Sequence, residues 1–303
     1  MGIIGILLLA VILIFLMTCV ITVIIYRIQF GKRVNAKIVD IKQIELKRKK
    51  VEFFSDCNRL TGYYYWNNQK ELSKDKIILF IHGHGLTHSD YLLEISEFVH
   101  RGYSVFAYDM TGCGESEGKA LKGFAQFVID AESAVLYLKK EAVKEIVVFG
   151  HSTGAYAAAA LLNIQNSNVN KAITVSAFDI PDRFVRGSMQ KSMKLFAYLI
   201  QFWLKIFERV QFGNYASLSG KEGIKKFRNK VLIIQGDKDQ QVPLKESLYN
   251  LKEELDHKQV EFLLVKDVGH YPTRIKNANG DELNKQVFDT IEKFIGGRNE
   301  RIY

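Results

Sequence analysis

Proline and cysteine are both scarce in this sequence, with three of each among 303 residues. So few prolines, together with the lack of any low-complexity tract, argue against long disordered linkers. The cysteines (Cys19, Cys57 and Cys113) are too scattered for a metal-binding motif, and their odd number gives no disulfide framework. We therefore expect free thiols in a reducing compartment. The sequence also has no internal repeat, which excludes a solenoid or propeller.

Charge is absent from residues Ile3 to Ile25, a run dominated by Leu, Ile and Val. As a helix these residues would extend about 35 Å, enough to cross the hydrocarbon core of a bilayer. A cleaved signal peptide fits less well, because no Lys or Arg precedes the run and no A-x-A pattern ends it. Myristoylation is not expected either, since Ile6 stands where the motif requires Ser or Thr. We predict an uncleaved transmembrane anchor over residues 1–26.

Positive charge is concentrated in two segments. Residues 27–50 carry nine Lys/Arg against two acidic residues, and residues 179–230 carry eleven against four. A uniformly basic protein would suggest nucleic acid, whereas a basic segment beside a membrane helix favours an anionic lipid surface. We therefore predict a membrane partner and no nucleic acid. Because Lys and Arg follow the apolar run, the positive-inside rule predicts a single-pass protein whose large domain is cytoplasmic.

Beyond residue 35, short apolar runs alternate with helical patterns. Residues 37–54 and 62–66 are predicted to be antiparallel strands around a turn at 56–58. Six later runs are almost continuously apolar, as expected of strands buried on both faces of a parallel sheet. They span 77–82, 104–109, 145–150, 172–177, 231–236 and 260–265, with helices expected near 90–100, 122–140, 153–166, 244–255 and 281–295. This alternation predicts a mostly parallel, doubly wound α/β sheet that binds ligands at the carboxyl ends of its strands.

Residues 180–228 interrupt the alternation and are too long for an ordinary connection. Within them, residues 188–212 show the period of one long helix, with Phe196, Trp203 and Val210 on its apolar stripe and Glu208 off it. We predict a helical cap. Two compatible interpretations stay open: a lid packed on the core domain, or a lid whose apolar face lines an acyl pocket or enters the bilayer.

The sequence Gly150-His151-Ser152-Thr153-Gly154 follows a predicted buried strand and precedes an alanine-rich helix. This is the G-x-S-x-G pattern, in which the serine occupies a sharp strand-to-helix turn and its hydroxyl projects. The residues two before and two after the serine must be small, because strand and helix come close together. The pentapeptide alone is a weak signal. Its placement favours Ser152 as a nucleophile over a structural serine in a turn.

A serine nucleophile needs a base, and the base needs an acid that orients it. His270 follows the last predicted strand and is the expected base, while its competitor His257 lies among charged residues at a predicted helix end. Asp239 is the favoured acid, because it lies in the loop beyond its strand, where the chain can turn the carboxylate toward the histidine. Asp237 and, more remotely, Asp179 remain alternatives.

Stabilising the oxyanion of a tetrahedral intermediate requires backbone amides. One should be the amide of Thr153, directly after the nucleophile. The other should come from the His82–Gly85 loop, where glycines let the backbone approach the substrate, and the amide of His84 is the expected donor. His82 and His84 could instead bind a metal, but no Asp, Glu or Cys partner is near them in the sequence. We predict no metal and no cofactor.

These motifs together resemble the α/β-hydrolase superfamily, and most closely its serine aminopeptidase and monoacylglycerol-lipase-like branch. The resemblance extends over about residues 50–296. It rests on the Ser152 elbow, the H-G-x-G loop at His82, the glycine-rich stretch after Asp109, the G-x-x-D-x-x-V-P loop around Asp239 and the final G-H at His270. It implies an α/β-hydrolase fold, and a structural Asp109 whose carboxylate holds the glycine-rich loop. It also implies hydrolysis of an ester, thioester or amide through an acyl-enzyme.

On this basis residues 1–26 form the anchor, 27–50 a basic juxtamembrane segment with the first strand, and 51–303 a hydrolase domain with its cap at about 180–228. The anchor and the basic, aromatic cap lead us to expect carboxylic esters with an acyl chain, such as monoacylglycerols or lysophospholipids. A peptidase, an amidase or an acyltransferase on the same residues remains an alternative. A membrane scaffold that retains an inactive hydrolase fold is the non-enzymatic one.

Overall fold

An eight-stranded sheet forms the centre of the molecule in the computed structural model, which describes residues 2–36, 46–164, 169–255, 258–277 and 280–296. Its strand order is β1-β2-β4-β3-β5-β6-β7-β8. The strands are β1 (Leu46–Ser55), β2 (Asn58–Asn67), β3 (Lys76–Ile81), β4 (Ser104–Tyr108), β5 (Glu145–His151), β6 (Val169–Val175), β7 (Val231–Gly236) and β8 (Val260–Val265). Strands β3 to β8 are parallel, and β1 and β2 form an antiparallel edge. The predicted, mostly parallel sheet is confirmed.

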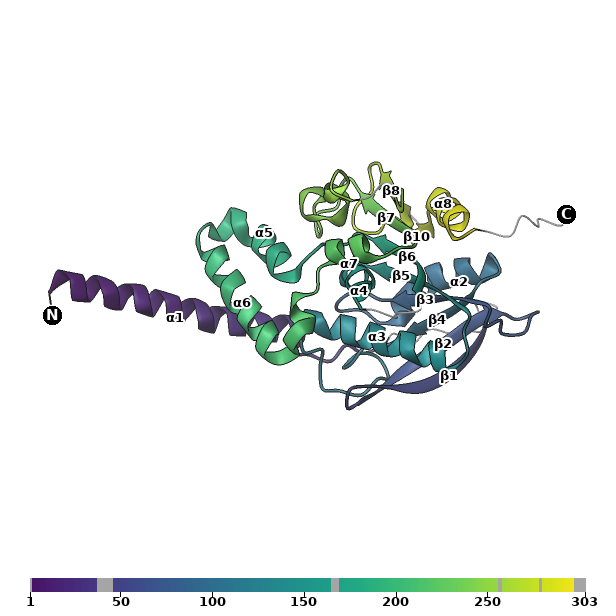
Figure 1. Ribbon diagram of the computed structural model, residues 1–303, viewed down its shortest axis with the longest axis horizontal. Coiled ribbons are helices and arrows are strands. Elements are labelled where there is room, and N and C mark those ends of the chain that lie inside the picture. Colours follow the sequence, from purple (N-terminus) through teal and green to yellow (C-terminus); the bar gives the residue numbers. More distant parts are fainter. Residues whose placement is uncertain (1, 37–45, 165–168, 256–257, 278–279, 297–303) are drawn as a thin grey trace.

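Helices cover both faces of this sheet (Figure 1). The core on one face includes residues of α3 (Phe124–Lys140), α4 (Thr153–Leu161) and α7 (Gly220–Lys226). The core on the other face includes residues of α2 (Leu92–His100) and α8 (Lys285–Ile295). From Ile77 to Ile81 of β3, successive residues alternate between the two cores and all are apolar, which explains why the strands appear in the sequence as continuous apolar runs.

The predicted long helix over residues 188–212 is wrong, because the chain reverses within it. Helix α5 (Pro181–Met193) ends at Lys194, which has φ +45°, and α6 (Phe196–Phe212) runs back beside α5. The Gln201 side chain of α6 joins the two helices: it donates to Asp182 and accepts from Arg186. The reversal lets apolar residues of both helices, among them Met189 and Leu204, line the same cavity.

The helix predicted near residues 244–255 is also wrong. Two short 3-10 helices, η4 (Leu244–Glu246) and η5 (Leu248–Leu251), occupy this stretch. The backbone here pairs with the segment just after β6 instead: the amide of Leu248 donates to the carbonyl of Ala177, and Ser247 forms a bridge with Phe178. These contacts hold the chain out of a continuous α-helix.

Other predicted boundaries also shift. A hairpin that was not predicted, β9 (Arg274–Asn277) with β10 (Gly280–Leu283), precedes α8. Two parts of predicted elements, residues 37–45 of the first strand and 165–166 of a helix, lie outside the described residues. The three cysteines are all free.

Helix α1 (Ile3–Phe30) extends away from the domain, and its N-terminal end projects beyond the cap (Figure 1). It is long and apolar enough to cross a membrane, with a mean hydropathy of 3.2 in its most apolar window. The segment after it is bound to the domain. The Arg33 guanidinium donates to the carbonyls of Gly114, Ser116 and Gly118, and Val34 pairs with Cys113. The helix is therefore joined to the domain by a fixed connection over residues 33–34.

Candidate active site

Ser152 lies at the turn between β5 and α4, with the strained backbone angles φ +56° and ψ −123°. The two elbow glycines explain how this turn is built. A Cβ on Gly150 would lie 2.3 Å from the carbonyl oxygen of Gly154, and a Cβ on Gly154 would lie 2.4 Å from that of Ile81. No side chain fits at either position. The two glycines therefore let α4 lie close to the ends of β5 and β3, with Ser152 on the sharp turn at the carboxyl edge of the sheet.

Asp239 and His270 contact each other directly at the same edge of the sheet. His270 Nδ1 lies 2.8 Å from Asp239 Oδ2, which leaves Nε2 as the ring nitrogen that could take a proton. The other Asp239 oxygen accepts hydrogen bonds from the amides of Gln241 and Val242, each at 2.9 Å. Burial acts to raise the pKa of Asp239. The bond from His270 and these amides outweigh it, so the pKa lies below its usual value and the carboxylate stays ionised.

His151, to which the sequence pattern assigns no role, supports the His270 loop. Its Nε2 donates to the carbonyl of His270 at 2.8 Å, and its Nδ1 accepts from the Tyr91 hydroxyl at 2.7 Å. The ring also stacks on Tyr271 at 4.5 Å. The residue next to Ser152 therefore fixes the backbone of His270. Its position beside the serine was the one signal in the sequence that could have revealed this role.

The loop after β3 contributes its backbone beside the elbow. The amide of Gly83 donates to the Tyr91 hydroxyl, so the next amide, that of His84, is the candidate oxyanion donor, together with that of Thr153. Both ring nitrogens of His82 are engaged, Nδ1 with the carbonyl of Gly83 and Nε2 with the amide of Met110. His84 Nε2 donates to the carbonyl of Gln29. These bonds give both rings a structural use in place of metal binding.

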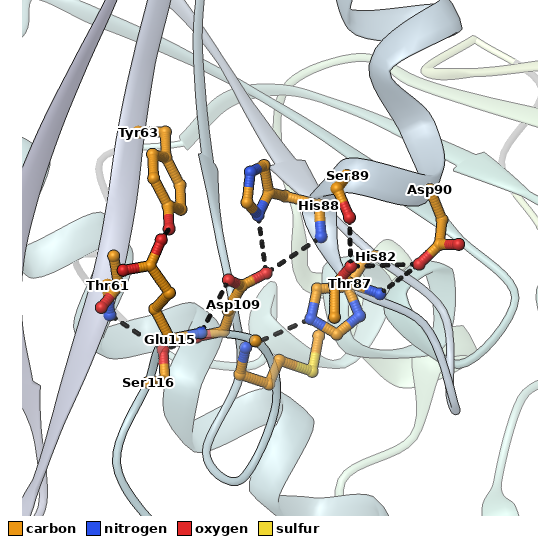
Figure 2. A network of polar contacts seen from close by, with 12 residues as sticks. Thr61, Tyr63, His82, Thr87, His88, Ser89, Asp90, Asp109, Glu115 and Ser116 are labelled. Atoms are coloured by element: carbon orange, nitrogen blue, oxygen red, sulfur yellow. Dashed lines mark hydrogen bonds and ion pairs between the residues drawn. The ribbon is translucent and has the colours of Figure 1, made fainter. Parts of the chain in front are cut away.

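Asp109 joins His88, in the segment between β3 and α2, to the glycine-rich loop that follows β4 (Figure 2). One of its oxygens accepts from the amide and Nδ1 of His88, at 3.0 and 2.7 Å, and the other accepts from the amide of Glu115 at 3.3 Å. Glu115 in turn accepts from the Tyr63 hydroxyl. Burial acts to raise the pKa of Asp109, but the contacts with His88 outweigh it, so the pKa lies below its usual value. The carboxylate thus holds both loops at the carboxyl edge of the sheet.

A cavity of about 430 Å³ lies above the elbow. Its walls come from three parts of the chain: the end of α1, the cap helices and the sheet edge. They comprise Thr22, Ile25, Tyr26, Gln29, Phe30, His84, Phe124, Ser152, Thr153, Phe178, Phe184, Val185, Ser188, Met189, Ile200, Leu204, Gln241 and Val242. Most of these side chains are apolar, and its volume falls within the usual range for small-molecule sites. The contribution of α1 could not be foreseen from the sequence.

The remaining candidates lie elsewhere. Asp179 accepts from the Ser219 hydroxyl and the Lys221 amide, so it anchors the end of the cap. Asp237 follows β7, and its buried Oδ1 has no hydrogen-bond partner among the described residues. His257 lies outside the described residues. Glu208 was expected off the apolar stripe of the cap but is buried, with 4% of its surface exposed, because Tyr26 and the start of α3 provide its hydrogen bonds.

The burial of His151 predicts a measurable acid sensitivity. Burial, with a smaller effect of His270, lowers the pKa of His151 to about 3. On acidification the unfolded chain therefore takes up this proton first, and stability falls by about 1.4 kcal/mol per pH unit below the ordinary pKa of about 6.5. Between pH 7 and pH 5, wild type should lose about 2 kcal/mol more than His151→Gln, which does not titrate. Denaturant unfolding in detergent, followed by tryptophan fluorescence, measures both slopes, and equal slopes would contradict a neutral, buried His151.

Comparison with known proteins gives one family match and many structural ones. Residues 73–219 match the family described as serine aminopeptidase, S33. No curated protein matches the chain.

Three similar solved structures illustrate the range. An esterase from Pyrococcus furiosus aligns with a TM-score of 0.64 and 20% identity over 87% of this chain and 95% of its own. A membrane phospholipase A, described as a bacterial virulence factor, aligns with a TM-score of 0.57 and 17% identity over 99% and 98%. An acylaminoacyl peptidase from Pyrococcus horikoshii gives 0.59 and 19% over 86% of this chain, but only 43% of its own. These structures and the strand order show that the chain has the α/β-hydrolase fold, and residues 73–219 are similar to the serine aminopeptidase S33 family.

Proposed function

We propose that the chain is a membrane-anchored serine esterase that cleaves carboxylic esters with an acyl chain. The observation that carries this proposal is the position of Ser152 on a strained elbow, at the wall of an apolar cavity and at the sheet edge that holds the Asp239–His270 pair. A serine hydroxyl, an imidazole fixed by a carboxylate and nearby backbone amides are the parts that acyl transfer requires.

In the proposed mechanism Ser152 Oγ attacks the ester carbonyl while His270 Nε2 takes its proton. Asp239 holds Nδ1 of the ring and stabilises the imidazolium that forms. The amides of Thr153 and His84 stabilise the oxyanion, and His270 returns the proton to the alcohol as it leaves. His270 then activates water, which attacks the acyl-enzyme and releases the acid. No cofactor enters this sequence of steps.

The cavity walls favour an acyl chain over a peptide, because aromatic and aliphatic side chains dominate them. Two of the similar structures, an esterase and a membrane phospholipase A, carry names that agree with an ester or lipid substrate. We therefore prefer esters such as monoacylglycerols or lysophospholipids to an amide substrate or an acyl acceptor other than water.

We also propose that α1 crosses a membrane and that the domain lies on the cytoplasmic side. The length and hydropathy of α1 support the first part. Arg27, Lys32 and Arg33 at its C-terminal end support the second, and the exposed Lys205 and Arg209 of the cap add positive charge for an anionic lipid surface.

Loss of the nucleophile should abolish both labelling and hydrolysis. We expect an alkyl fluorophosphonate to label wild type and Ser133→Ala equally and to leave Ser152→Ala unlabelled, because the probe needs the activated hydroxyl. In-gel fluorescence measures labelling, and release of p-nitrophenol from a series of acyl esters measures turnover. Equal labelling of Ser152→Ala would end the nucleophile assignment. A preference for acetate over longer chains would contradict the acyl-chain part of the proposal.

The two aspartates after β7 allow a matched test of the acid. Asp239→Asn should reduce kcat for p-nitrophenyl butyrate by about 10⁴-fold, because a neutral amide neither holds the required tautomer nor stabilises the imidazolium. Asp237→Asn, with the same chemical change two residues away, should stay within about tenfold of wild type. Steady-state kinetics measures kcat for both variants. If Asp237→Asn lost more activity than Asp239→Asn, the role of the acid would be reassigned to Asp237.

The anchor has its own test. In membranes washed with carbonate at high pH, the full-length chain should remain in the pellet, because α1 is held by the hydrocarbon core. Protease added to intact cells should leave the domain uncut and should digest it once the membrane is opened. Release into the wash would contradict the anchor, and cleavage in intact cells would contradict the orientation.

A further inference from the structure

The last turns of α1 form one wall of the cavity above Ser152. Thr22, Ile25, Tyr26 and Gln29 line it from successive turns, and Phe30 closes the end. A helix that served only as a tether would end at the domain surface. This one continues into the site, so the cavity has a complete wall only while α1 is in place.

A single buried carboxylate fixes α1 in this position. Glu208 of the cap accepts from the Tyr26 hydroxyl at 2.6 Å and from the amides of Phe124 and Ala125, at 2.9 and 3.2 Å. The two amides belong to the first turn of α3, where a negative charge is favoured. Burial raises the pKa of Glu208, and its three donors partly offset this. Anchor, cap and core helix therefore meet at one residue.

The anchor also contacts the candidate oxyanion loop. The Phe30 ring packs against the His84 imidazole, with centroids 4.9 Å apart, and His84 Nε2 donates to the carbonyl of Gln29. Phe30 also packs edge-on against Phe124. The position of α1 is thus coupled to the loop whose amide is assigned to the oxyanion.

The α1 wall presents mainly hydrocarbon to the cavity, because its hydroxyl groups are already bonded. Thr22 Oγ1 donates to the carbonyl of Thr18, and the Tyr26 hydroxyl donates to Glu208. Ile25 lies between them and has no polar group. Such a wall suits an acyl chain, since a polar ligand would be desolvated there without new partners.

The cap reaches far along α1. Phe202 and Trp203 pack against Phe15, and Trp203 Nε1 donates to Thr18 Oγ1 at 3.2 Å. Phe15 and Phe30 are about 22 Å apart along a helix axis. About 20 residues fill the hydrocarbon core of a bilayer, so a membrane around residues 3–22 would contain both Phe15 and Thr18.

The cap also has exposed apolar side chains on the first half of α6 and the turn before it, including Phe202, which packs against Phe15. Leu195 is 75% exposed, and Phe196 and Phe202 are also exposed. A cap that ended in water would leave these side chains unfavourably hydrated, whereas insertion to the depth of Phe15 would bury them in lipid. The cavity between α1 and the cap is therefore beside the bilayer.

We propose that α1 is part of the substrate-binding site: the acyl chain of a lipid ester enters from the bilayer between α1 and the cap and lies against Ile25 while its ester group reaches Ser152. This inference rests on the proposed esterase function and extends it by naming the chain-binding wall. Ile25 is then a residue that determines chain-length specificity, although it belongs to the anchor.

Adjacent isoleucines of α1 supply a matched pair for the test. Ile25 lines the cavity, whereas Ile24 is 52% exposed and faces away from it. In the full-length protein in detergent, Ile25→Trp should lower the ratio of kcat/KM for p-nitrophenyl laurate to that for the acetate at least about tenfold, because a misfit in an apolar pocket costs that much or more. Ile24→Trp adds the same bulk to the same helix, and its ratio should stay within about twofold of wild type.

Equal ratios for wild type and both variants would overturn the inference while leaving the esterase proposal intact. If wild type shows no hydrolysis beyond that of Ser152→Ala, the proposed function would be overturned instead. If Ile25→Trp misfolds and hydrolyses neither the laurate nor the acetate, Ile25→Ala takes its place. Enlarging the cavity should shift the preferred ester to a longer chain, and an unchanged preference would overturn the inference that α1 binds the chain.

A second measurement does not depend on any variant. An alkyl fluorophosphonate with a diazirine in its chain is attached to Ser152 of the wild-type protein in phosphatidylcholine vesicles and then photolysed. Mass spectrometry should find cross-links from the Ser152 peptide to residues 22–30. Cross-links confined to residues 46–180 would show that the chain lies away from α1 and would overturn the inference.

Discussion

The close approach of two backbones at the end of β5 is the constraint on which the site depends. Gly150 at the end of β5 approaches α4, and Gly154 of α4 approaches the end of β3, more closely than a side chain would allow. Ser152 between them has a positive φ. Strain of this kind costs on the order of 1–3 kcal/mol and persists only where the surroundings enforce it. Here the surroundings are the buried parallel strands, whose side chains fill the cores on both faces of the sheet.

Around the elbow, polar groups have fixed partners, while the cavity itself is lined mainly by hydrocarbon. His151 holds the His270 loop, Asp109 holds the loops after β3 and β4, and the amides of Gln241 and Val242 hold Asp239. Such bonds keep the chemical groups in place without reorganisation when charge develops. The arrangement separates two tasks. In the proposed function, the polar frame would serve the reaction and the apolar space formed by α1 and the cap would serve binding.

Much of the fold could be predicted because its signal is local. Buried parallel strands produce continuous apolar runs, and the motifs around Ser152, Asp239 and His270 follow such runs at the carboxyl ends of strands. The cap was harder. Periodicity alone did not reveal the reversal at Lys194, nor did it reveal that Glu208 is buried, because both depend on packing against distant segments. The support from Tyr91 and the wall from Ile25 involve contacts across more than 50 residues, which no short window of sequence contains.

The bonds of Arg33 to the 114–118 loop, together with Glu208, have a consequence for how the molecule meets its substrate. They hold the domain at one angle to the α1 axis, so it does not swing freely on a flexible stalk. With α1 in a bilayer, the same edge of the sheet would then always face one leaflet. Encounter would become a two-dimensional search, in which the rate follows the mole fraction of substrate in the membrane and the bulk concentration matters little. Dilution of the substrate with inert lipid would then lower the rate of hydrolysis, although no inhibitor binds to the protein.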